Sequence, residues 1–327
     1  MLWQDFRHLR QPSRIVPTVT FDQPAITLSE DHQFLERMDH LESLRASTTV
    51  YKEDSRESSL RLAPAWFNMA LLHPPGMAKM SAPPLSPVLL CIGGHDPSGG
   101  AGIQADAEAA RAAGIHAATV VSCLTSRDTR GLRGLWPQPL EQIEEECRMI
   151  LADSEVKAIK IGLIGGSPLA RWLCHLADEY PELPWVLDPV LATGAGQKVT
   201  DAGLIDQIGS RLLGRCSLAT PNLPEAQTLS GARDPDDCAG RLLASGCPWI
   251  LITGTHAASP EVVNRLYGRD GSQRSWSWPR LPWEYHGSGC TLASAIAARL
   301  ALGQAMEMAV AEAQDYTWRS LKTAART

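Results

Sequence analysis

From residue 88 onward, short apolar runs alternate with segments in which apolar residues recur every three or four positions. The apolar runs predict strands at residues 88–92, 118–124, 158–164, 185–191, 217–220 and 249–253. The periodic segments between them predict helices, for example at 104–113, 140–151 and 168–180. Apolar strands separated by helices indicate an α/β fold, in which helices cover both faces of a mostly parallel sheet.

The last part of the chain has a different pattern. Residues 262–267 and 272–278 alternate polar and apolar positions around a turn at 268–271, which predicts an antiparallel hairpin at one edge of the sheet. Two predicted helices, at 290–302 and 305–323, close the chain. In such sheets the ligand crevice lies beyond the carboxyl ends of the strands. Nearly every polar motif of this chain falls at one of those ends.

Residues 1–86 show neither the hydrophobic pattern of strands nor that of helices. They carry charge clusters, contain no glycine before Gly76 and end in a proline-rich stretch. This composition predicts a poorly structured leader or linker without a core of its own, so the folded domain is expected at 87–327. We expect Met77 or Met80 to be the biological start, in which case the leader is a start-site artefact.

Composition narrows the classes of protein that fit. The chain has 327 residues, of which 44% are hydrophobic and 20% charged, as in ordinary globular domains. A net charge of -6 argues against nucleic acid as a partner. The eight cysteines form no C-x-x-C pair and predict free, buried thiols in a cytoplasmic protein. No apolar run approaches the roughly 18 residues that span a membrane, so no membrane partner is expected.

The strongest chemical candidate is residues 286–292 (HGSGCTL), which run from a turn into a helix of small residues. Gly287 and Gly289 lack the Cβ atoms that would block a phosphate, and the amides of a helix N-terminus, such as that of Ser288, bind anions. Cys290 would then lie beside the anion. An ordinary helix-start turn, capped by Ser288 or Thr291, fits the same residues.

The first predicted strand runs into a loop, residues 93–102, that contains five glycines. The loop lacks the lysine of a P-loop and the spacing of a dinucleotide fingerprint. We therefore expect it to hold something other than nucleotide phosphates, with a purely structural turn as the alternative.

Oxygen-bearing side chains follow the later strands. Asp188, Asn222 and Glu225 follow two neighbouring strands and together fit a hydrated Mg²⁺ beside a triphosphate, although a single carboxylate at a strand end is more often a helix cap. Thr253 and Gly254 follow the next strand and fit the β- and γ-phosphates of a nucleotide. We assign no role to the loop histidines 256 and 286.

Six segments in order resemble one known family. They are 93–106 (GGHDPSGGAGIQAD), 128–131 (DTRG), 160–163 (KIGL), 187–190 (LDPV), 220–225 (TPNLPE) and 286–292. The chain from 88 to 322 resembles the hydroxymethylpyrimidine/phosphomethylpyrimidine kinases of thiamine biosynthesis, in the ribokinase-like superfamily. The resemblance implies a three-layer sandwich, usually a homodimer, and two successive phosphorylations with Mg-ATP. The first acts on 4-amino-5-hydroxymethyl-2-methylpyrimidine and the second on its monophosphate.

The resemblance also implies roles for individual residues. The pyrimidine pocket would be lined by Gly94, Asp106, Leu163 and Val190, and the nucleotide and magnesium side by Asn222 and Glu225. Residues 287–290 would form the anion hole, with Cys290 where related sugar and pyridoxal kinases have an aspartate base. A helix N-terminus can lower the pKa of a thiol. Cys290 is therefore expected either to accept the hydroxyl proton or only to line the site.

Two positions depart from the family pattern. Arg127 stands where many relatives have a glutamine that contacts the pyrimidine ring, and an arginine offers donors but no acceptor. It is expected to reject the exocyclic amine of the pyrimidine, unless it swings away or instead binds a substrate phosphate. Thr253 stands where many relatives have a lysine, so a cationic phosphate contact is missing. Activity is expected to be weaker or biased towards the phosphorylated substrate. A pyridoxal kinase and a catalytically weak pyrimidine-binding regulator are the alternatives.

Overall fold

The described residues form one mixed sheet of nine strands in the order β3-β2-β1-β4-β5-β6-β7-β8-β9. The structure, a computed structural model, describes residues 87–128, 131–192, 199–256, 259–283 and 285–324, and the leader predicted at 1–86 lies outside them. The strands are β1 (Val88–His95), β2 (His116–Asp128), β3 (Gly131–Pro137), β4 (Val156–Ile161), β5 (Trp185–Leu187), β6 (Leu218–Ala219), β7 (Trp249–Ile252), β8 (Glu261–Gly268) and β9 (Gln273–Pro279). The six central strands are parallel, whereas β3 at one edge and β8 and β9 at the other are antiparallel.

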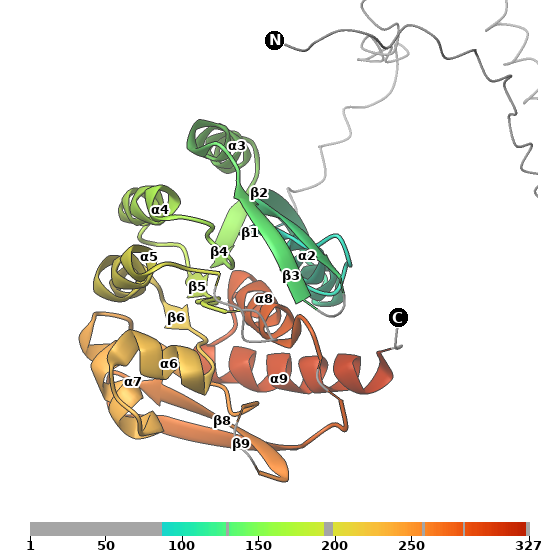
Figure 1. Ribbon diagram of the computed structural model, residues 1–327, viewed down its shortest axis with the longest axis vertical. Coiled ribbons are helices and arrows are strands. Elements are labelled where there is room, and N and C mark those ends of the chain that lie inside the picture. Colours follow the sequence, from blue (N-terminus) through green and yellow to red (C-terminus); the bar gives the residue numbers. More distant parts are fainter. Residues whose placement is uncertain (1–86, 129–130, 193–198, 257–258, 284, 325–327) are drawn as a thin grey trace, which may run out of the picture. The chain divides into compact units, whose positions relative to one another are not determined.

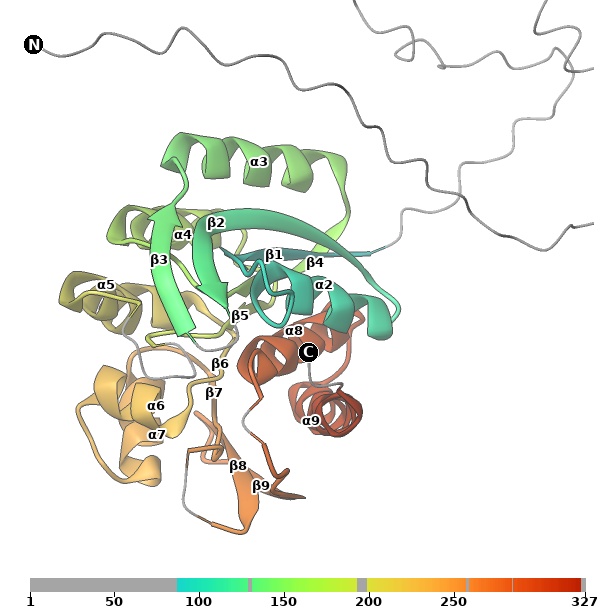
Figure 2. The same cartoon turned by 45° about the vertical axis from the view of Figure 1, so that its right-hand side comes forward.

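Helices cover both faces of the sheet and give the fold three layers (Figures 1 and 2). Helices α2 (Gly102–Ala112), α8 (Ser288–Ala301) and α9 (Met306–Thr323) pack on one face. On the other face lie α3 (Leu140–Asp153), α4 (Ser167–Glu179), α5 (Ala202–Gln207), α6 (Leu223–Ser230) and α7 (Pro235–Ala244). A π-helical turn (Ile208–Leu212) and a 3-10 turn (Leu213–Arg215) follow α5. The predicted three-layer α/β fold with an antiparallel edge hairpin is confirmed.

The two faces of the sheet form two separate buried clusters. Along β1, Leu90 and Ile92 belong to the cluster under α3 and α4, while Leu89 and Cys91 belong to the cluster under α2 and α8. All four side chains are at most 1% exposed. Successive residues of a strand point to opposite faces, so a strand that is buried on both sides must be apolar throughout. This burial explains why the central strands could be recognised as continuous apolar runs.

Four central strands end earlier than their apolar runs predict. Strand β4 ends at Ile161, β5 at Leu187, β6 at Ala219 and β7 at Ile252, instead of at 164, 191, 220 and 253. Beyond β5, Pro189 cannot donate a hydrogen bond to a neighbouring strand. The chain therefore leaves the sheet at its carboxyl edge, and Asp188 lies in the connection that follows the strand, not within it.

The hydrophobic pattern missed β3 and the helices α5, α6 and α7. Strand β3 pairs with β2 in the antiparallel direction, with Leu124 opposite Trp136. Helices α6 and α7 are only 8 and 10 residues long, which leaves few turns in which a period can appear. Their starts do carry a recognisable signal, because Asn222 and Asp234 cap them and a proline occupies the first turn of each.

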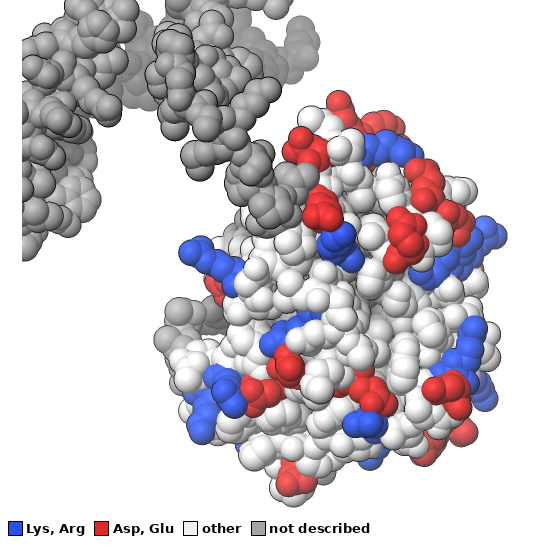
Figure 3. All heavy atoms as spheres, turned by 180° about the vertical axis from the view of Figure 1, so that it is seen from behind, with Lys and Arg blue, Asp and Glu red and all other residues white. Residues whose placement is uncertain are grey.

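The surface carries charges of both signs. On the face shown in Figure 3, basic and acidic side chains are interspersed over the domain. All eight cysteines are free, and all except Cys290 are buried. Among the helices that the structure describes, none has both the length and the apolar content that crossing a bilayer requires.

Candidate active site

The turn that starts α8 packs directly on the glycine-rich loop that follows β1. Gly287 is the N-cap residue and has a φ of 82°, in the left-handed region that favours glycine. A Cβ atom at this position would overlap the carbonyl group of Gly100. No side chain caps the helix, so the expected alternative of a cap by Ser288 or Thr291 is not observed. The amides of the first turn, including that of Gly289, are therefore uncapped donors.

Asp188 lies beside this turn. A Cβ atom added to Gly289 would lie 3.8 Å from Oδ1 of Asp188, an ordinary van der Waals distance. Asp188 is only 5% exposed, and its Oδ2 atom has no hydrogen-bond partner. Burial raises the pKa of this carboxyl, while the charge of Lys160 and a hydrogen bond from Cys290 oppose the rise. An unpaired buried carboxylate oxygen next to uncapped helix amides is the arrangement expected where a polar ligand completes the site.

A buried ion pair lies close to Asp188. Nζ of Lys160 in β4 is 2.7 Å from Oδ1 of Asp106 in α2, and neither side chain is exposed. The hydroxyl of Ser294 in α8 donates to the same oxygen at 2.7 Å. The other oxygen of Asp106 has no partner and faces Gly93, where a Cβ would lie 3.5 Å away. Asp106, expected to line the pyrimidine pocket, thus joins two helices and a strand below the glycine-rich loop.

Cys290 is half-buried in the first turn of α8. Burial raises the pKa of its thiol to about 12, and the positive charge of Lys160 only partly opposes that rise. The expectation that the helix N-terminus lowers this pKa is therefore wrong. Desolvation is the largest cause of the rise, and the nearby carboxylates of Asp188 and Asp106 add to it. At neutral pH the thiol is protonated, which favours a role in lining the site over a role as the base.

Two of the expected pocket residues lie together at the carboxyl ends of β1 and β4. A Cβ atom at Gly94 would lie 3.1 Å from Cδ2 of Leu163 and 3.2 Å from Sγ of Cys123, so any larger residue would crowd this place. The hydroxyl of Ser122 donates to the carbonyl oxygen of Leu163 and fixes the segment after β4. Val190 is half-buried in the connection after β5, two residues from Asp188.

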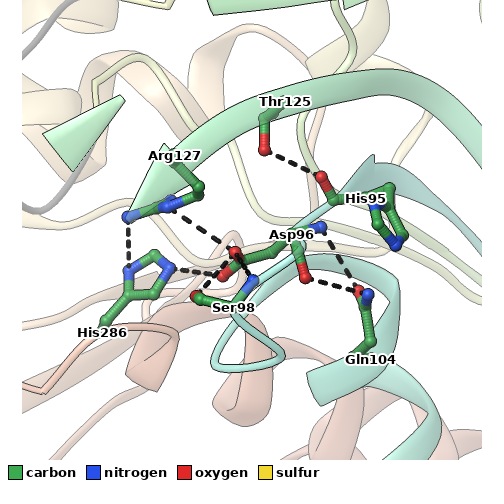
Figure 4. A network of polar contacts seen from close by, with 7 residues as sticks. All are labelled: His95, Asp96, Ser98, Gln104, Thr125, Arg127 and His286. Atoms are coloured by element: carbon green, nitrogen blue, oxygen red, sulfur yellow. Dashed lines mark hydrogen bonds and ion pairs between the residues drawn. The ribbon is translucent and has the colours of Figure 1, made fainter. Parts of the chain in front are cut away.

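A polar network around Asp96 joins the glycine-rich loop to two other segments (Figure 4). The carboxylate of Asp96 accepts hydrogen bonds from the amide and the hydroxyl of Ser98, and its Oδ2 lies 2.7 Å from Nε2 of His286. Nη2 of Arg127 lies 3.4 Å from Nδ1 of the same imidazole. Gln104 bonds the backbone of Asp96 through both its amide oxygen and its amide nitrogen. The network joins the glycine-rich loop, the end of β2 and the turn before α8.

The residues expected on the nucleotide side also meet. Asn222 and Thr253 form an isolated parallel bridge, so the ends of β6 and β7 are adjacent. Asn222 and Glu225 form a capping box, in which each side chain accepts from the backbone amide of the other. The amide of Gly254 donates to Asn264 at 3.0 Å, so this amide is already engaged.

A cavity of about 210 Å³ lies beside these residues. Its lining residues are Leu223, Pro235, Ile252, Thr253, Gly254, Ser259, Val263 and Arg265.

The carboxyl groups expected to hold magnesium interact with each other. Burial and the charge of Asp188 raise the pKa of Glu225 to about 8. The described residues contain no group of three potential metal ligands among histidine, cysteine, aspartate and glutamate. Mg²⁺, however, keeps several waters and binds through one or two carboxylates together with phosphates. The unpaired oxygen of Asp188 therefore fits a hydrated magnesium ion, whose positive charge would lower the repulsion between Asp188 and Glu225.

Sequence reasoning missed four of the residues that build this site. Lys160 and Ser294 complete the buried cluster around Asp106, and Asp96 and His286 form the pair that links two loops. Lys160 carried a readable signal, because a charge within an apolar strand requires a buried partner. His286 did not, because its partner Asp96 is 190 positions away in the sequence.

Comparison with known proteins gives consistent results. A family model described as phosphomethylpyrimidine kinase matches residues 96–327. A hydroxymethylpyrimidine/phosphomethylpyrimidine kinase of Streptomyces coelicolor is 36% identical over 247 residues, which cover 73% of this chain and 90% of the relative.

Two solved structures extend the comparison to the fold. The ADP complex of Bacillus subtilis pyridoxal kinase has a TM-score of 0.65 and 26% identity, over 71% of this chain and 90% of that one. The phosphomethylpyrimidine kinase of Clostridium difficile 630 has a TM-score of 0.63 and 27% identity, over 72% of this chain and 99% of that one. The sequence matches name pyrimidine kinases, and the structural matches include both pyrimidine and pyridoxal kinases.

Proposed function

Because the chain belongs to the phosphomethylpyrimidine kinase family, we propose that it transfers the γ-phosphate of ATP to 4-amino-5-hydroxymethyl-2-methylpyrimidine and then to its monophosphate. The product would be the diphosphate used in thiamine biosynthesis. The observation that carries this proposal is the uncapped first turn of α8, which faces the unpaired oxygen of Asp188 and packs on the glycine-rich loop.

The residues of this site support phosphoryl transfer by positioning and by charge stabilisation. The amides of residues 288–290 would donate hydrogen bonds to the transferred phosphoryl group, where negative charge is concentrated. Gly94, Leu163 and Val190 would hold the pyrimidine, with the free oxygen of Asp106 as an acceptor for its polar groups. A strong base is less necessary in such reactions, in keeping with the protonated thiol of Cys290.

The nucleotide would lie over the ends of β6 and β7. Asn222, Glu225, Thr253 and Gly254 are proposed to contact ATP, and the cavity beside Thr253 would accept part of the nucleotide. Asp188 and Glu225 would hold Mg²⁺ through its water shell. The ion would supply positive charge to the phosphates and lower the repulsion between them and the two carboxyl groups.

A pyridoxal kinase is the nearest rival, since a pyridoxal kinase is among the similar solved structures. One assay separates the candidates: ADP release with the pyrimidine alcohol, its monophosphate and pyridoxal offered separately. We expect turnover with both pyrimidines. Turnover with pyridoxal alone would reject the proposal, and tight pyrimidine binding without ADP release would indicate a regulator.

We also propose that the protein is a cytoplasmic homodimer. Eight free thiols support a reducing compartment. Strand β3 lies at an edge of the sheet, and the cross-strand pair Leu124 and Trp136 is 43% and 55% exposed. An edge strand with exposed apolar side chains favours association. Light scattering during size-exclusion chromatography would give the mass in solution, and a monomer would reject the dimer.

A further inference from the structure

Arg127, at the end of β2, makes few hydrogen bonds for a largely buried cation. Its side chain is 13% exposed. A guanidinium group offers five N–H donors, and buried donors are normally bonded. Yet Nε is buried without a hydrogen-bond partner, and among the described residues the side chain has one hydrogen-bond contact, the 3.4 Å approach of Nη2 to His286. The group therefore has donors available for an acceptor that enters the site.

The neighbouring carboxylate does not fill this role. Nε of Arg127 lies 3.6 Å from Oδ1 of Asp96, which is an ion-pair distance and too long for a hydrogen bond. Oδ1 of Asp96 already accepts two hydrogen bonds from Ser98, and Oδ2 is bound to His286. Asp96 thus holds the guanidinium group in place without using up its donors.

The position of Arg127 in the sheet identifies the side of the site that it serves. Strand β2 is adjacent to β1, which carries Gly94, and four places away from β6 in the sheet order. The residues proposed to bind ATP follow β6 and β7. The contact with His286 places the guanidinium group next to the residue that precedes Gly287, at the start of the α8 turn. Figure 4 shows Arg127 and His286 on the same side of Asp96.

We propose that Arg127 binds the phosphate of the phosphorylated pyrimidine and makes the monophosphate the preferred acceptor of this enzyme. The inference rests on the proposed function and concerns one of its two substrates. A guanidinium group donates two parallel hydrogen bonds to two phosphate oxygens. A neutral side chain, or a cation such as lysine that cannot bind in this bidentate way, does not reproduce this contact. The alcohol has no phosphate, so it cannot use this contact.

The test compares the wild type with Arg127→Gln, which keeps a polar side chain but removes the positive charge and the paired N–H donors of the guanidinium group. We expect kcat/KM for the monophosphate, divided by kcat/KM for the alcohol, to fall by about tenfold to a hundredfold, the range expected for a hydrogen bond to a charged group. The loss should lie mainly in KM, with a matching rise in the Kd of the monophosphate measured by calorimetry without ATP. For Arg127→Lys, which keeps the charge, the ratio of the two kcat/KM values should lie between that of the wild type and that of Arg127→Gln. Arg171→Gln, on the exposed surface of α4, is the matched control and should leave the ratio unchanged.

Each other outcome decides against the inference or separates it from the proposed function. An equal loss with both substrates, accompanied by a lower Tm, would show that Arg127 only supports the loops. A rise in the KM of ATP with an unchanged ratio would assign the guanidinium group to the nucleotide phosphates. If the wild type phosphorylates neither pyrimidine, the proposed function fails. The Kd values of the monophosphate and the alcohol then still decide whether Arg127 binds phosphate. If Arg127→Gln and Arg127→Lys change the Kd of the monophosphate and the Kd of the alcohol by equal factors, the inference about Arg127 is rejected.

Discussion

Nζ of Lys160 lies 2.7 Å from a carboxylate oxygen of Asp106, and both side chains are completely buried. Burial alone would lower the pKa of Lys160, but the negative charges of Asp106 and Asp188 raise it above its ordinary value. The lysine therefore stays charged and places a fixed positive charge near Cys290 and Asp188 in the candidate site. In this position it partly neutralises the carboxylates that would otherwise repel a phosphoryl group.

Removal of one partner of this pair should destabilise the fold. Lys160→Met leaves the carboxylate of Asp106 buried and unpaired, for which we expect a loss of about 3–5 kcal/mol in the free energy of unfolding. Lys157→Met is the matched control from the same strand, because Lys157 is 45% exposed and pairs with the equally exposed Glu155. Its loss should be about 1 kcal/mol or less. Denaturant unfolding of both variants measures the difference, and equal losses would refute the importance of the buried pair.

The same pair shows why the sequence predicted the core of the fold better than the site. Leu89 to Ile92 are buried on both faces, so their apolar run alone indicated a central strand. The contact between Lys160 and Asp106 joins residues 54 positions apart, and no local pattern encodes such a distance. The pKa of Cys290 is raised because burial desolvates its thiol. The extent of that burial depends on the packing around the thiol, which the sequence does not show.

Gly289 should matter for its lack of a side chain. Gly289→Leu would place a branched side chain beside Asp188, where even a Cβ atom lies 3.8 Å from the carboxylate, and it would obstruct the amides of the turn. We expect phosphoryl transfer to be abolished while pyrimidine binding remains largely intact. ADP release and the Kd of the pyrimidine measure the two effects.

Gly289→Ala separates obstruction from strain in the turn. Its single methyl group fits at ordinary contact distance, so this variant should retain more transfer than Gly289→Leu. An unchanged kcat in Gly289→Leu would contradict the assignment of this turn to the phosphoryl group.

The protonation of His286 should depend on Arg127. Burial lowers the pKa of the imidazole most, the hydrogen bond to Asp96 raises it, and the charge of Arg127 lowers it again, with a net decrease. A neutral ring would accept from Arg127 at Nδ1 and donate to Asp96 from Nε2. Because the folded pKa lies below the unfolded value of about 6.5, the unfolded state binds the proton first. The contribution of His286 to stability is thus complete above that value and decreases as the pH falls through the window between the two.

NMR titration of ¹⁵N-labelled histidine side chains tests this dependence. Arg127→Gln removes a cation next to the ring, so the pKa of His286 should rise, and the variant His286→Asn identifies the resonance. A pKa that stays constant or falls in Arg127→Gln would contradict the contact between the two side chains.

Cys290 should behave as a protonated thiol and not as the base of the reaction. With its pKa raised to about 12 by burial, the rate of alkylation by iodoacetamide should keep rising between pH 7 and pH 10 without a plateau. Cys290→Ser assigns the labelled site, since the other seven cysteines are buried. The same variant should keep kcat within about tenfold of the wild type, because loss of a general base typically costs about a hundredfold or more. A plateau in alkylation below pH 9, together with a larger loss of kcat, would instead identify Cys290 as the group that accepts the hydroxyl proton.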